Sequence, residues 1–316
     1  MKKIHESLLA WYELHGRHAL PWRKTRDIYH VYLSEVMLQQ TQVSRVMEEY
    51  YPRFLEKFPT LSDLARAKQE EVLANWSGLG YYSRARNLHA TALTCKDKLP
   101  NSLEELLKLP GIGRYTASAI CSFGYEQSVS VVDTNIARVI KRYFALLDVK
   151  DADVWKYADK LLNHKASRAH NLALMDLGSM VCLPQNPKCE ECPLQLTCKG
   201  KDAPELYIKK KKTKYESMEL FYGICIKDNK IALTPASGNM YKNMLELPMV
   251  EPLEDEFITT FKHSYTKYRL SVHLYKLEEP TCEVVWKDII TLAEAPISSL
   301  TKKAIEKVNF IFLSSW

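Results

Sequence analysis

The chain has 316 residues, of which 46% are apolar and 26% are charged, and its formal net charge is +6. At about 150 residues per domain, this length and composition predict two compact globular units or three small ones. No apolar stretch approaches the ~18 residues of a membrane-spanning helix, and the charged N-terminus shows no secretory signal. Membrane, collagenous and disordered classes are therefore excluded, whereas the basic excess is compatible with a polyanionic partner.

Residues 1–200 predict a nearly all-helical region. Apolar side chains recur there at helical spacing, and short connections containing Pro or Gly separate the segments. The run Ser128–Val132 is the exception, because it is strand-like. The predicted helices are Val31–Tyr51, Leu64–Trp76, Arg84–Cys95, Leu103–Leu109, Thr116–Phe123, Ile136–Leu146, Asp153–His164 and Asn171–Val181.

The character of the sequence changes after residue 200. The lysine run Lys209–Lys212 lies in a segment with few apolar residues, which predicts a linker over residues 201–215. Short β-rich runs follow and alternate with two helical patterns, so residues 216–316 are expected to form an α+β domain. The predicted strands are Glu219–Ile226, Lys230–Thr234, Arg269–Leu277 and Cys282–Lys287, and the predicted helices are Glu254–Phe261 and Ser298–Val308.

Four of the eight cysteines, Cys182, Cys189, Cys192 and Cys198, lie close together in the sequence. In a chain without an export signal, such clustering favours a metal site over a disulfide scaffold. Zinc sites usually combine two short pairs of cysteines, and only Cys189 and Cys192 form such a pair here. The spacing therefore favours a 4Fe–4S cluster, with zinc and free structural cysteines as the alternatives.

A glycine hairpin, Leu109–Ala117, connects two predicted helices. Gly111 and Gly113 permit a tight turn and leave backbone N–H groups exposed at the start of the next helix, where one phosphate can bind. An ordinary helix–helix turn with a glycine cap is the alternative.

Two acidic residues are candidates for chemistry. Asp133 precedes a basic helix and is expected to cap its N-terminus, where the helix dipole favours an anion that can stabilise a developing cation. Glu35 lies among apolar residues of a predicted helix. A solvent-facing Glu is the simple interpretation, but burial would raise its pKa and suit it to deliver a proton.

Taken together, these segments resemble the adenine DNA glycosylases of the MutY family, in the helix–hairpin–helix superfamily that also contains endonuclease III. The resemblance implies a mainly α glycosylase region over residues 1–200 and a C-terminal α+β Nudix-like lesion-recognition domain over residues 216–316. Within the first region, residues 25–134 would form the helix–hairpin–helix core, and residues 1–24 with 135–200 the iron–sulfur subdomain. The segments that carry the resemblance are Leu20–Arg23, Ser34–Val43, Trp76–Arg86, Leu109–Ala117, Val131–Arg138 and the cysteine cluster.

The family's enzyme flips an adenine mispaired with 8-oxoguanine or guanine out of duplex DNA and hydrolyses its N-glycosidic bond. Glu35 matches the general acid that protonates adenine N7, and Asp133 matches the carboxylate that stabilises the oxocarbenium-like sugar. Tyr115 and Asn135 match residues that support this site. The residues that match DNA-binding positions are Gln40, Thr41, Leu79, Tyr81, Gly111, Gly113, Tyr265 and Thr266.

Endonuclease III-like enzymes carry Lys at the position of Tyr115, and that amine forms a Schiff base that drives strand cleavage. A phenol cannot form an imine, so base removal without strand cleavage is expected. The resemblance also implies one 4Fe–4S cluster, a monovalent cation at the hairpin, double-stranded DNA as partner, and a monomer. A cytoplasmic, nucleoid-associated location is expected if the protein is bacterial.

The chain departs from the family pattern at Ile28 and Thr134, where Pro and Gly are usual, and at Tyr265-Thr266-Lys267, where Phe-Ser-His is common. The C-terminal region lacks a Nudix box, so nucleotide hydrolysis is not expected there. Two alternative functions stay open at this point. A relative that removes thymine or another mispaired base would share the hairpin, Asp133 and the cysteines but lack the Glu35 segment. A non-catalytic DNA-binding iron–sulfur protein would need neither acid.

Overall fold

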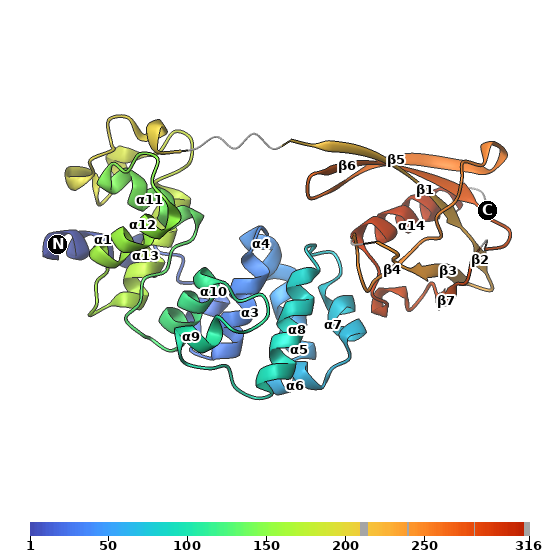
Figure 1. Cartoon of the computed structure of the whole chain (residues 1–316), viewed down its shortest axis with the longest axis horizontal. Coiled ribbons are helices and arrows are strands. Elements are labelled where there is room, and N and C mark those ends of the chain that lie inside the picture. Colours follow the sequence, from blue (N-terminus) through green and yellow to red (C-terminus); the bar gives the residue numbers. More distant parts are fainter. Residues whose placement is uncertain (209–213, 239, 281, 313–316) are drawn as a thin grey trace. The chain divides into compact units, whose positions relative to one another are not determined.

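The computed structural model describes residues 1–208, 214–238, 240–280 and 282–312 (Figure 1). The lysine run of the predicted linker lies outside these residues. The described chain forms two compact units: unit 1 comprises residues 1–51, 60–62 and 91–208, and unit 2 comprises residues 52–59, 63–90 and those from 214 onward. Each unit groups separate segments of the chain that pack together. The predicted domain boundaries therefore stay a prediction. No helix among the described residues has the length and apolar character needed to cross a membrane.

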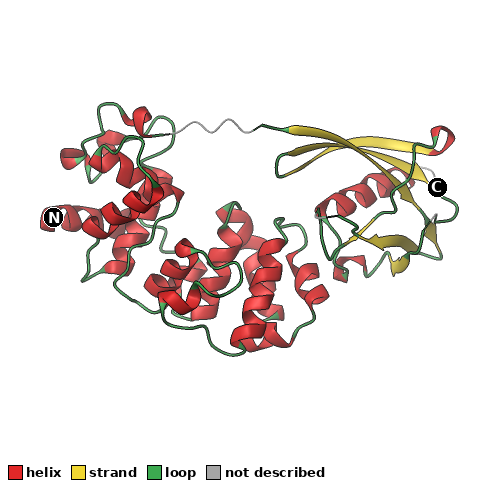
Figure 2. Cartoon of the chain, in the orientation of Figure 1, coloured by secondary structure: helices red, strands yellow, loops and turns green. Residues whose placement is uncertain are grey.

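Unit 1 consists of helices joined by turns (Figure 2). Two π-helical turns, Val46–Tyr50 and Ile120–Gly124, continue α4 and α10. The C-terminal part of the unit contains the short 3-10 turns Cys189–Glu191, Gln195–Thr197 and Pro204–Tyr207. The helices are α1 (Lys2–His15), α2 (Pro21–Lys24), α3 (Ile28–Leu38), α4 (Val43–Arg45), α9 (Leu103–Leu106), α10 (Arg114–Ala119), α11 (Thr134–Phe144), α12 (Asp151–Leu161) and α13 (Ser167–Met180).

Helix α11 packs against α12 and α13, and α1 packs against α13, so that the four helices form one bundle (Figure 1). Ile136, Val139, Ile140 and Tyr143 recur every three or four residues, and all four are buried in one apolar cluster to which α1, α12 and α13 also contribute. Such spacing places apolar side chains on one helical face, where burial of each stabilises the fold by about 1.5–3 kcal/mol. The predicted helix Ile136–Leu146 is therefore confirmed, with both bounds slightly closer to the N-terminus.

The predicted helix Val31–Tyr51 is wrong as a single element. Helix α3 ends at Leu38, and Gln40 has a left-handed backbone with φ of 58° before α4 begins at Val43. A non-glycine residue in this region ends a helix, and neither Gly nor Pro marks the position in the sequence. The strand-like run at 128–132 lies in a loop that leads into α11.

A buried charge cluster connects the N-terminal segment to α13. Arg23 donates two hydrogen bonds to the Asp176 carboxylate, at 2.5 and 2.8 Å, and Arg17 donates through its backbone N–H and its Nε. The Asp176 side chain is fully buried, and that of Arg23 is nearly so. Burial alone would raise the pKa of Asp176, but the hydrogen bonds and charges of the two arginines hold it below its usual value.

Replacing Asp176 by Asn is expected to lower the free energy of unfolding by about 3–5 kcal/mol, because the substitution leaves a buried guanidinium without its counter-ion. Urea unfolding at neutral pH measures this loss. Asp153→Asn is the matched control, since Asp153 pairs with Lys156 at 3.1 Å on the surface, and its loss should cost less than about 1 kcal/mol. Equal effects of the two substitutions would contradict the structural role of Asp176.

Unit 2 combines helices from the middle of the chain with all the strands of the described structure. In the first sheet the strand order is β1-β6-β5, with β1 parallel and β5 antiparallel to β6. Helix α14 contacts β5 beneath this sheet (Figure 1). In the second sheet, β3 pairs antiparallel with β2, β4 and β7. The helices are α5 (Tyr51–Lys57), α6 (Leu61–Arg66), α7 (Gln69–Trp76), α8 (Ser83–Cys95) and α14 (Ser299–Phe312); the strands are β1 (Glu216–Ile224), β2 (Ile226–Lys227), β3 (Lys230–Pro235), β4 (Leu245–Glu246), β5 (Phe257–Tyr265), β6 (Tyr268–Lys276) and β7 (Val285–Asp288).

The α+β character of the C-terminal region is confirmed, but two predicted helices differ from the structure. Glu254–Phe261 is a 3-10 turn followed by strand β5, whose residues 257–261 are aromatic or mostly β-branched and pair with β6. The predicted helix Leu64–Trp76 divides into α6 and α7.

Candidate active site

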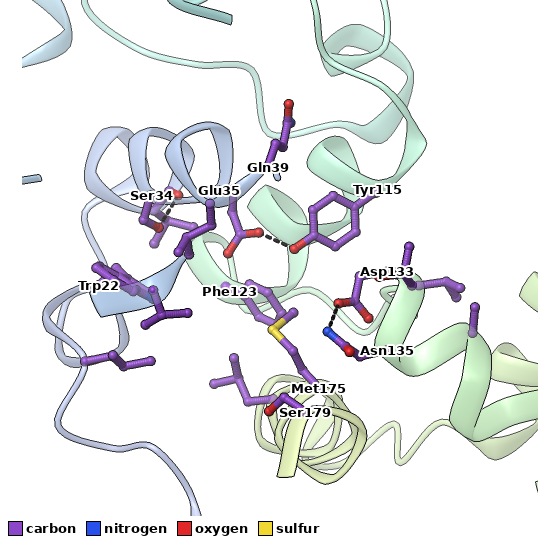
Figure 3. Close-up of a pocket in the computed structure, with 18 of the residues that line it drawn as sticks. Trp22, Ser34, Glu35, Gln39, Tyr115, Phe123, Asp133, Asn135, Met175 and Ser179 are labelled. Carbon is purple, nitrogen blue, oxygen red and sulfur yellow. Dashed lines mark hydrogen bonds between the residues drawn. The ribbon is translucent and has the colours of Figure 1, made fainter. Parts of the chain in front are cut away.

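A cavity of about 790 Å³ lies within unit 1, in the size range of ligand-binding pockets. The side chains of Glu35, Tyr115, Asp133 and Asn135 line it (Figure 3). Glu35 lies on helix α3, Tyr115 lies on α10, and Asp133 and Asn135 lie at the start of α11. Four positions predicted from three separate motifs thus meet at one cavity.

Glu35 is buried, with 6% of its surface exposed, and accepts a hydrogen bond from the Tyr115 hydroxyl. Burial raises the pKa of Glu35 to about 7, because the ionised form loses its hydration. The Tyr115 hydrogen bond opposes this rise, and the negative charge of Asp133 adds to it. Near neutral pH the side chain is therefore present in both protonation states, as a general acid requires.

Tyr115 is the second residue of α10, directly after the glycine hairpin. Gly111 has a left-handed φ of 71°, which favours glycine, and Gly113 caps the helix with extended backbone. Burial and the charges of Glu35 and Asp133 raise the pKa of Tyr115 well above that of a free phenol. The hydroxyl is therefore protonated and acts as a donor to Glu35.

Asp133 caps α11, as predicted. Its Oδ1 accepts from the Ile136 backbone N–H at 2.6 Å, and its Oδ2 accepts from the Asn135 side-chain amide at 2.8 Å (Figure 3). Burial raises the pKa of Asp133, and these hydrogen bonds oppose the rise because they stabilise the carboxylate. The cavity thus contains two carboxyl groups with unlike surroundings.

Arg138 and Gly178 support this arrangement, and the sequence analysis missed both roles. Arg138 donates to Asn135 Oδ1 at 3.0 Å, to the Gly178 carbonyl at 2.6 Å and to the Cys182 carbonyl at 2.7 Å. A methyl group on Gly178 would lie 2.7 Å from the Asn135 Cβ, so only glycine permits this approach of α13 to α11. A glycine inside a predicted helix was the available signal.

Cys182, Cys189, Cys192 and Cys198 line one small cavity near the C-terminal end of α11. Burial raises the pKa of Cys192 to about 12, and it also raises those of Cys189 and Cys198. Arg142 lies with its Nη1 3.3 Å from the Cys182 sulfur. Among the described residues, no three His, Cys, Asp or Glu side chains are close enough to hold one metal ion. Four cysteine side chains that line one cavity are nevertheless the donor set that an iron–sulfur cluster uses, and these residues fit such a cluster.

Gln40 and Thr41 line the same cavity as Glu35, and the Gln40 side chain is exposed. The other predicted DNA-binding side chains belong to unit 2. Leu79 is 5% exposed, whereas Tyr81 is 39% exposed and has a left-handed φ of 49°. Tyr265 and Thr266 lie at the turn between β5 and β6.

Comparison with known proteins gives these observations a family context. Residues 33–173 match the HhH-GPD superfamily of base excision DNA repair proteins, and residues 182–196 match the iron–sulfur binding domain of endonuclease III. An adenine DNA glycosylase of Buchnera aphidicola (subspecies Baizongia pistaciae) is 42% identical over 204 residues, which is 62% of this chain and 58% of that protein. The human adenine DNA glycosylase is 42% identical over 217 residues, or 63% of this chain and 39% of the relative.

Solved structures agree with this context. A thermostable thymine-DNA glycosylase has a TM-score of 0.59 and 29% identity over 64% of this chain and 97% of its own. An endonuclease III in a DNA complex has the same fold, with a TM-score of 0.55 and 24% identity, and covers 63% of this chain and 93% of its own. The chain spans only about 40% to 60% of the length of the curated relatives it matches. Residues 33–173 thus have the helical fold of the HhH-GPD superfamily of base excision DNA repair proteins, and residues 182–196 are similar to the iron–sulfur binding domain of endonuclease III.

Proposed function

We propose that the chain is a monofunctional adenine DNA glycosylase that removes adenine mispaired with 8-oxoguanine or guanine in duplex DNA. One observation carries this proposal: Glu35 and Asp133 line the same cavity, and the pKa of Glu35 is raised to about 7. The adenine DNA glycosylases among its relatives support the choice of base. Thymine removal is the second candidate, supported by the similar thymine-DNA glycosylase structure.

In the proposed reaction, adenine leaves only after it accepts a proton, because its anion is a poor leaving group. Protonated Glu35 gives this proton to adenine N7, and the C1′–N9 bond breaks with its electron pair going to the base. The ionised Asp133 carboxylate stabilises the positive charge that develops on the sugar. Water then adds to C1′ and loses its proton, which completes the hydrolysis.

The absence of strand cleavage is part of the proposal. Tyr115 is held as a protonated donor to Glu35, and a phenol cannot form the Schiff base on which strand cleavage depends. The backbone N–H groups at Gly111 and Gly113 would bind a DNA phosphate, and a monovalent cation there is a further candidate. Gln40, Thr41, Leu79, Tyr81, Tyr265 and Thr266 would contact the duplex.

The test is single-turnover base release from three duplexes that carry adenine opposite 8-oxoguanine, guanine or cytosine, together with a duplex that carries thymine opposite guanine. We expect adenine release in the order 8-oxoguanine, guanine, cytosine, no thymine release, and strand breaks only after alkali. Release of thymine without release of adenine would favour the second candidate function, thymine removal. Efficient trapping by borohydride would show that the enzyme forms an imine.

The pH dependence of kcat/KM follows from the two carboxyl groups. Glu35 must be protonated, so kcat/KM should fall tenfold per pH unit above about 7. Asp133 must be ionised, so kcat/KM should also fall at acid pH, below a pKa that burial raises above the usual value. A rate that keeps rising to pH 9 would exclude Glu35 as the acid.

We further propose that the four clustered cysteines hold one 4Fe–4S cluster, which organises the 182–198 loop without taking part in the hydrolysis. Metal analysis of the purified protein is expected to give about four iron atoms per chain and no stoichiometric zinc. Cys192→Ser should remove most of the iron and destabilise the loop, whereas the isolated Cys95→Ser should keep it. One zinc per chain would favour the alternative site.

A further inference from the structure

The turn between α7 and α8 has a strained backbone. Gly78, Gly80 and Tyr81 all have left-handed φ values, of 95°, 77° and 49°. For Tyr81 this conformation is costly, and such residues persist only where their surroundings hold them. The turn carries Leu79 and Tyr81, two of the residues proposed to contact DNA.

Residues close to the turn in the sequence hold part of its backbone in place. The Trp76 Nε1 donates to the Gly80 carbonyl at 3.0 Å, and Arg84 donates to the same carbonyl at 3.1 Å. The Arg84 guanidinium also lies over the rings of Trp76 and Tyr81.

The other part comes from the C-terminal region of unit 2. The hydroxyl of Tyr82 accepts the Ser299 backbone N–H at 3.1 Å and the Gly78 backbone N–H at 3.4 Å. Ser77 donates to the Ile297 carbonyl at 2.9 Å. One buried phenol thus joins the strained turn to the start of α14.

Tyr82 also begins a row of aromatic rings. Its ring lies 6.3 Å from that of Tyr241, which lies 4.8 Å from that of Tyr265 at the β5–β6 turn. Tyr82 and Tyr241 are each 3% exposed. The Tyr241 hydroxyl bonds to His263 Nε2 at 3.2 Å, and its own backbone is left-handed, with φ of 61°. The row therefore runs through the core of unit 2 from one DNA-contacting segment to the other.

We propose that Tyr82 and Tyr241 are positioning residues that fix the 77–82 turn relative to the 265–266 turn. The two turns would then contact the base opposite the target adenine as a single recognition unit. This inference rests on the proposed function. The two segments are more than 180 positions apart in the sequence, and these buried aromatic contacts connect one to the other. Because neither residue is part of the cavity with Glu35, their loss should change discrimination between opposite bases more than catalysis.

The first test needs no DNA. In hydrogen–deuterium exchange on the free, full-length protein, Tyr82→Phe should speed exchange at residues 78–81 about tenfold, as expected when one or two buried hydrogen bonds are lost. Residues of α10 should not change. Tyr275→Phe is the matched control, because Tyr275 is also buried in unit 2 and packs on Phe257 instead. Unchanged exchange in Tyr82→Phe would overturn the link.

The second test measures discrimination. The ratio of single-turnover rates for adenine opposite 8-oxoguanine and opposite guanine should fall about tenfold in Tyr82→Phe, with the rate opposite guanine changed less than threefold. Thr266→Ala should lower the same ratio, and the double variant Tyr82→Phe/Thr266→Ala should lower it no further. If the two sites acted independently, their fold-changes in the ratio would multiply. The proposal would be overturned if Tyr82→Phe kept the wild-type ratio, or if the effects of the two substitutions on the ratio multiplied. If the wild-type protein released no adenine, the proposed function would be refuted. Hydrogen exchange would still decide whether Tyr82 fixes the 77–82 turn.

Discussion

Replacing Glu35 by Gln is expected to lower the single-turnover rate of adenine release by about 10²–10⁴-fold, the usual contribution of a general acid. The amide keeps the size of the side chain and can still accept the Tyr115 hydrogen bond. It carries no acidic proton, so the adenine cannot leave as a neutral base.

Binding separates this loss from a folding defect. The dissociation constant for a duplex with a non-hydrolysable adenosine analogue should change less than about threefold, since the substitution leaves the segments proposed to contact DNA intact. Glu104→Gln is the control, because Glu104 is exposed and pairs with Lys108 at the surface. Retained turnover in Glu35→Gln would remove Glu35 from the acid role.

Replacing Asp133 by Asn is expected to slow base release by about 10³-fold, because the developing positive charge on the sugar then lacks its anion. Asn is as good an N-cap as Asp, so α11 should form normally. The amide still accepts the Ile136 N–H but loses the hydrogen bond from the Asn135 side chain, so the free energy of unfolding should fall by only about 0.5–1.5 kcal/mol. Such a loss leaves the protein folded and cannot account for a chemical step that is slower by about 10³-fold.

Asp27→Asn is the matched control for this experiment. Asp27 caps α3 in the same way, accepting from the His30 backbone N–H at 3.0 Å, but its side chain is exposed. This variant should keep the wild-type rate. If both substitutions slowed base release equally, capping rather than charge would explain the loss, and Asp133 would have no direct part in the reaction.

Local patterns predicted the helices well where burial is periodic along one segment. Helix α11 shows this, because its apolar spacing, the Asp133 cap and the basic last turn all indicate the same element. Strand β5 shows the opposite case. Its assignment depends on register with β6, such as Phe261 opposite Val272, and no window around residues 254–261 contains that information.

The candidate site could be predicted only in part. Periodicity identified no special role for Glu35, and its position came from the family resemblance. Burial of that carboxyl and its hydrogen bond with Tyr115 depend on the packing of α3 against α10, which no single motif reveals. The contacts of Arg138 with Asn135 and Cys182 depend on how closely α11 approaches α13, for which Gly178 was the only sequence signal.

The raised pKa of Glu35 has a cost for the folded protein. In the unfolded chain this carboxyl titrates at 4.5, and in the fold at about 7. The proton is therefore held more tightly in the fold, and ionisation above pH 7 destabilises it by about 3 kcal/mol, whereas below pH 4.5 the effect is absent. A laboratory selection for heat resistance in alkaline medium would consequently favour Glu35→Gln, and would enrich stable proteins that lack the proposed acid.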